Sequence, residues 1–112
     1  MSTEARELIL FIENDADLYR QRHQPMILNL AKKFAKGKYD HALAPKLWYY
    51  LADAGAKKYV HDFVGRSAPV GSTFSVAVRK EVAAQLANDN LEEVMETAKK
   101  FVKPVKVPRA KK

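Results

Sequence analysis

The chain has 112 residues, of which 47% are hydrophobic and 29% are charged, and it contains no cysteine. These proportions are typical of one folded domain, and they exclude a disulfide scaffold, a thiol nucleophile and cysteine metal sites. The formal net charge is +7. Residues 1–98 carry 13 basic and 13 acidic side chains, whereas residues 99–112 carry only basic ones, so we expect a neutral body and a cationic tail.

The N-terminal segment has neither the basic start nor the long apolar stretch of a secretory signal. No apolar run approaches the ~18 residues of a membrane-spanning helix. We therefore expect a cytoplasmic protein without a membrane partner, and the absence of cysteine fits a reducing compartment.

Residues 8–36 have apolar side chains every three or four positions, which is the period of one helix face. Asn14 or Asp15 could cap a fresh helix start, and Pro25 should kink or break the helix. The pattern thus leaves open one kinked helix or two helices. We expect Gly37 to end the segment in a left-handed conformation.

The next helix is predicted to begin at an Asp40 cap, or at Pro45 as its true start. Its aromatic content suggests that it is the central helix. Gly55 lies inside the pattern, where it could mark a close crossing of two helices. The apolar stripe of this helix is expected to contain Leu43, Leu47, Tyr50 and Ala54.

Trp48, Tyr49 and Tyr50 follow one another in this helix, so they cannot all face one core. We expect Tyr49 to be exposed and the other two rings to pack in the core. The aromatic surface around Trp48 and Tyr49 is a candidate partner-binding face, and its rings could also stack on bases.

Residues 65–73 have the composition of a loop, after which a Ser or Thr should cap a third helical segment. Asn90, with Glu93 three residues later, resembles a capping box that begins a short amphipathic helix. Pro104 and Pro108 end all helix.

No stretch shows the alternation of a strand with hairpin turns. The predicted fold is therefore all-α: a compact bundle of four to five helices in residues 1–102, followed by a flexible, basic, proline-containing and disordered tail in residues 103–112.

Catalytic and metal-binding patterns are not apparent. His23, His41 and His61 are too far apart in the sequence for a helical zinc pair, which needs a spacing of three or four residues. We find no nucleophile elbow and no phosphate-binding loop. The sequence therefore predicts no enzyme, no metal and no cofactor.

The basic residues give the strongest functional indication. Residues 18–38 contain six cations and no acid, and the cationic tail could extend the same footprint. Such segments bind nucleic-acid backbones with little sequence specificity. The candidate nucleic-acid-binding residues are Lys32, Lys33, Lys36, Lys38, Lys99, Lys100, Lys103, Lys106, Arg109, Lys111 and Lys112.

Three alternatives stay open for these cations: DNA or RNA, an acidic protein partner, or a tail that only improves solubility. The alternative function is a protein-interaction module, such as a phage accessory factor, inhibitor or virion component, that uses the exposed aromatic face.

Two segments, IENDADLYRQ at residues 12–21 and YDHALAPKLWYYLADAGAKKY at residues 39–59, resemble small bacterial and bacteriophage helical proteins of unassigned function. The resemblance covers about residues 8–63. It implies a phage or mobile-element context but no activity, so it assigns no functional residue.

Overall fold

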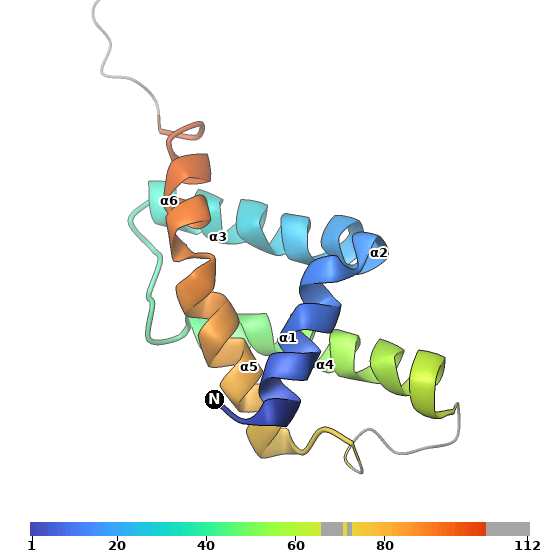
Figure 1. The fold of residues 1–112 in the computed structure, drawn as a ribbon. Helices are drawn as coiled ribbons and strands as arrows, with labels where there is room; N and C mark the ends of the chain where they lie inside the picture. Colours follow the sequence, from blue (N-terminus) through green and yellow to red (C-terminus); the bar gives the residue numbers. More distant parts are fainter. Residues whose placement is uncertain (66–70, 72, 103–112) are drawn as a thin grey trace, which may run out of the picture.

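The computed structural model describes residues 1–65, 71 and 73–102, and it confirms the all-α fold, since none of these residues forms a strand. The described residues form five helical segments, two of which include a wide π-helical turn, named η1 or η2 (Figure 1). The elements are α1 (Thr3–Asn14), α2 (Ala16–Leu18), η1 (Tyr19–His23), α3 (Gln24–Ala35), α4 (Ala44–Tyr59), η2 (Val60–Val64), α5 (Val76–Asp89) and α6 (Leu91–Ala98).

The break between α1 and α2 lies at Asp15, as one of the two alternatives predicted. Asp15 has an extended backbone, and its carboxylate accepts the N–H of Leu18 at 2.9 Å, which is the bond of an N-cap. Pro25 does not break the helix. It lies in the first turn of α3, and the preceding turn is widened so that the N–H of Gln24 reaches the carbonyl of Tyr19.

The end of α3 is set by Gly37, as predicted. Gly37 has a φ of 71°, and its N–H donates to the carbonyl of Phe34 at 3.0 Å. The N–H of Lys38 donates to the carbonyl of Lys33 at 2.8 Å. These two bonds form a Schellman cap, which turns the chain away from the helix immediately after Lys36.

Helix α4 is the central helix, because α1 and α5 both cross it (Figure 1). It begins at Ala44 with Pro45 in its first turn, so the proline marks the true start. Asp40 instead caps the tight turn before the helix, where its carboxylate accepts the N–H of Ala42 at 3.0 Å.

The predicted close crossing at Gly55 is confirmed. A Cβ atom at this position would lie 2.4 Å from Cγ1 of Ile12, a completely buried side chain of α1. The absence of a side chain therefore allows α1 to lie directly against α4.

The corner between α5 and α6 contains a buried polar pair. The Oδ1 atom of Asn90 lies 2.9 Å from Nε2 of His23, and its Nδ2 donates to the carbonyl of Leu86 at 2.8 Å. The predicted capping box is therefore wrong, because the Asn90 side chain turns into the core and makes no cap bond to α6. The pair joins the corner to the helical segment that continues into α3.

An ion pair joins the α1–α2 break to α4. The Nζ atom of Lys58 lies 2.7 Å from the carboxylate of Asp15. Burial acts to raise the pKa of Asp15, but hydrogen bonds from Lys58 and from the N–H of Leu18 outweigh it, so the pKa lies below its usual value.

Acid should therefore weaken the fold through this pair. A lowered pKa in the folded state stabilises the protein above the unfolded pKa, and this contribution disappears as the pH falls through the folded pKa. We expect the difference in thermal stability between the parent and Asp15→Asn to shrink as the pH falls below about 4. A difference that stays constant from neutral pH into acid would contradict this expectation.

Candidate nucleic-acid interface

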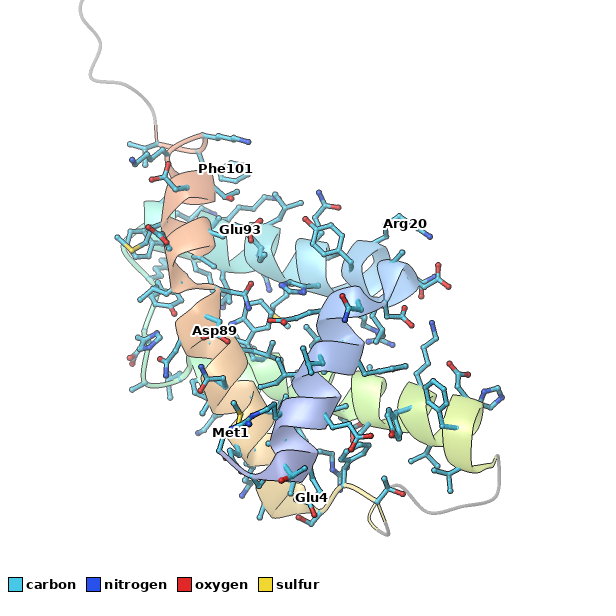
Figure 2. All side chains as sticks on the ribbon, in the orientation of Figure 1. Met1, Glu4, Arg20, Asp89, Glu93 and Phe101 are labelled. Carbon is cyan, nitrogen blue, oxygen red and sulfur yellow. The ribbon has the colours of Figure 1, made fainter. Side chains whose placement is uncertain are left out.

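The C-terminal end of the first predicted basic zone lies beside Lys99 and Lys100, the described start of the second zone. Helix α3 packs against α6, and Nζ of Lys32 lies 5.8 Å from the centre of the Phe101 ring, just beyond α6 (Figures 1 and 2). The C-terminal ends of both helices thus lie at the same end of the molecule. We call this region the basic end, and it consists of Lys32, Lys33, Lys36, Lys38, Lys99 and Lys100.

All six lysines of the basic end are exposed. Lys99 pairs with Glu96 at 3.2 Å. Within residues 1–65, 71 and 73–102, no ion pair engages the other five. The basic end therefore presents a local excess of positive charge to solvent.

The other candidate cations, Lys103, Lys106, Arg109, Lys111 and Lys112, lie outside the described residues, as does the whole segment 103–112 predicted to form the tail. In the sequence they follow Val102, which is the last described residue beyond α6.

The predictions for the aromatic face are partly wrong. Trp48 is completely buried, with its ring edge against His23 at 5.5 Å between centres, so it cannot contact a partner. Tyr49, which was predicted to be exposed, is half-buried and lies beside the guanidinium of Arg79. Tyr50, which was predicted to be in the core, is the exposed ring, with 65% of its surface accessible.

The small residues of α4 explain why Trp48 is buried and Tyr50 is exposed. The buried stripe runs through Ala52, Gly55 and Ala56, where the neighbouring helices approach closely, and this rotates Trp48 inward and Tyr50 outward. The expected stripe through Tyr50 followed the large side chains and ignored this constraint.

A groove of about 530 Å³ lies between α4 and α5, and the sequence did not predict it. Tyr50 and Tyr49 line it together with the two exposed lysines Lys46 and Lys80. Its remaining lining residues are Pro45 and Ala83. No local pattern could have indicated this site, because two helices separated in the sequence create it.

A second hollow of about 290 Å³ adjoins the start of α4. Lys33 and Lys38 of the basic end line it, together with Tyr39 and the carboxylate-bearing Asp40. Lys46 lines both this hollow and the groove, so the two adjoin at this side chain.

Each of the three histidines contacts different partners in the described part of the chain. His23 contacts Asn90, His41 contacts Tyr39 and Asn88, and His61 contacts Asp62. Among residues 1–65, 71 and 73–102, no three His, Asp or Glu side chains are grouped as a metal site would require. Over the same residues, no helix has the length and apolar character needed to span a membrane.

Comparison with known proteins finds no family model, curated protein or solved structure that matches this chain.

Proposed function

We propose that this protein is a non-enzymatic nucleic-acid-binding protein that contacts the phosphate backbone through its basic end. The observation that carries the proposal is the packing of α3 on α6, which brings six exposed lysines to the same end of the molecule. Lysines that neutralise phosphates release condensed counterions, and this release favours binding at low salt.

The helix dipole explains only part of this arrangement. Cations are favoured in the last turn of a helix, which accounts for Lys32 and Lys33. Lys38 lies beyond the end of α3, and Lys100 lies beyond the end of α6. The chain then continues with five more cations and no acid, so the positive charge exceeds what the helix ends require.

The chemistry of the cations favours backbone contact over base recognition. Every cation of the basic end is a lysine, whose ammonium group acts as a point charge on a phosphate. Base-specific contacts more often use the bidentate guanidinium of arginine. We therefore propose binding with little sequence preference, in the phage or mobile-element context that the resemblance of residues 8–63 implies.

A triple substitution of the basic end tests the proposal. In Lys36→Gln/Lys38→Gln/Lys100→Gln, we expect weaker binding to a DNA duplex, because three phosphate contacts are lost. The slope of log affinity against log salt should decrease in magnitude by about 2 to 3. Fluorescence anisotropy of labelled DNA at several salt concentrations measures both quantities.

The matched control removes the same charge elsewhere. Arg6, Arg20 and Lys57 are exposed and lie outside the basic end; Figure 2 shows Arg20 far from Phe101. Arg6→Gln/Arg20→Gln/Lys57→Gln should largely retain the parent slope. Equal losses in both variants would mean that only net charge matters, and the basic end would then have no special role.

Removal of residues 103–112 tests the cations outside the described residues. We expect the truncated chain to bind more weakly than the parent and to retain the part of the salt dependence that the basic end provides. If the parent binds neither DNA nor RNA at low salt, the proposal fails, and the basic end is left to the alternative of an acidic protein partner.

A further inference from the structure

We infer that the preferred ligand is single-stranded nucleic acid, and that the groove between α4 and α5 receives its bases. This inference rests on the proposed function and assigns the ligand class. Its basis is the combination of two tyrosines and two lysines in one groove that connects to the basic end.

The groove has the lining that an unpaired base requires. Tyr50 is 65% exposed and offers a ring for stacking, while Tyr49 already lies 5.9 Å from the guanidinium of Arg79. The lining is mostly apolar, the exposed Lys46 and Lys80 bring positive charge to its edge, and none of the described residues that line it is acidic. Single-stranded nucleic acid is bound by this combination of aromatic rings for the bases and cations for the backbone.

The lysines around the groove also lie on the side that leads to the basic end. Lys46 lines both the groove and the second hollow, and Lys33 and Lys38 of the basic end line the second hollow, whose one acidic lining residue is Asp40. A strand with bases in the groove could therefore place its neighbouring phosphates near Lys46, Lys33 and Lys38. The adjoining lysines distinguish the groove from an isolated apolar depression.

A duplex cannot use the groove in the same way. Its bases are stacked and paired, and a base must leave the stack at a cost of a few kcal/mol before it can enter a pocket. A duplex should consequently contact the lysines of the basic end without placing a base in the groove.

An amphipathic peptide is a less suitable occupant. Grooves that hold such helices bind a row of apolar anchors, whereas no Leu, Ile, Val or Met among the described residues lines this groove. The lining is instead two aromatic rings, two lysines, a proline and an alanine.

The test compares labelled oligo-dT of about 12 nucleotides with a duplex of the same length. We expect Tyr50→Ala to weaken binding of oligo-dT by about tenfold, which is a typical effect of losing one base–aromatic stack. For Tyr50→Ala, the slope of log affinity for oligo-dT against log salt should stay unchanged, because stacking involves no counterion release. The affinity of this variant for the duplex should also stay unchanged. Tyr50→Phe, which keeps the ring, should bind like the parent.

Phe63→Ala is the matched control. Phe63 is 67% exposed on η2, at the far end of the same helical segment, and it does not line the groove. Its removal should leave both affinities unchanged. Lys46→Gln/Lys80→Gln should decrease the magnitude of the salt slope more for oligo-dT than for the duplex.

The outcomes separate this inference from the proposed function. If Tyr50→Ala weakens both ligands equally or neither, the groove does not receive bases, while the proposed function stands as long as the Lys36/Lys38/Lys100 variant loses duplex binding. If the parent binds neither ligand, both fail. Binding of an acidic amphipathic peptide that depends on Tyr50, without binding of oligo-dT, would overturn the inference in favour of a protein partner.

Discussion

Gly55→Ala is expected to lower the free energy of unfolding by about 2 kcal/mol or more, the cost of overpacking a core. The new Cβ would lie 2.4 Å from Cγ1 and 2.8 Å from Cδ1 of Ile12. Ile12 is completely buried, so it cannot swing into solvent. At an unconstrained helical position the same change would stabilise the helix by up to about 1 kcal/mol, so the sign of the effect is diagnostic.

Urea denaturation followed by fluorescence of Trp48, the single tryptophan, measures this change. The control is a double-mutant cycle with Ile12→Ala, which removes both clashing atoms and alone costs about 2–5 kcal/mol. Because the new methyl then occupies vacated space, the double variant should lose less stability than the sum of the single variants. Additive losses, or a stabilised Gly55→Ala, would contradict the close crossing.

Asn90→Ala is expected to cost about 1–3 kcal/mol, because it leaves a buried polar group without its partner. Asn90 donates from Nδ2 to the carbonyl of Leu86, so its Oδ1 faces His23 and accepts the proton on Nε2. Truncation removes this acceptor. It also removes the hydrogen bond that joins the corner between α5 and α6 to the segment that leads into α3.

The loss should be smaller when both partners are made apolar. In His23→Leu/Asn90→Leu no buried polar side chain is left unpaired, so the double variant should be more stable than the sum of the single variants predicts. Hydrogen exchange adds a local measurement, since amides of α6 should exchange faster in Asn90→Ala. Unchanged stability and unchanged exchange would mean that the pair does not hold the corner.

Features that depend on neighbouring residues were predicted well from the sequence. The cap at Asp15 and the left-handed end at Gly37 need only local backbone chemistry. The close crossing at Gly55 involves the distant Ile12, but a local signal indicated it, because a glycine inside a helix needs a packing reason. The all-α class followed from the period of the apolar residues.

Features that depend on distant residues could not be predicted in this way. Asn90 has the local pattern of a cap, yet its side chain contacts His23, which lies 67 positions away in the sequence. The exposure of Tyr50 instead of Tyr49 depends on which face of α4 its neighbours approach. The groove requires two separate helices, so neither the site nor its connection to the basic end through Lys46 could be seen in one segment.

The lysines at the ends of α3 and α6 should lower the stability of the protein when no ligand is bound. Like charges held on one surface repel one another, and this repulsion opposes the compact state. A polyanion that neutralises them would relieve the repulsion, and it would shift the folding equilibrium toward the folded state to the extent that it binds this state more tightly than the unfolded chain. Under the proposed function, binding of a polyanion at the basic end should therefore stabilise the packing of α3 on α6.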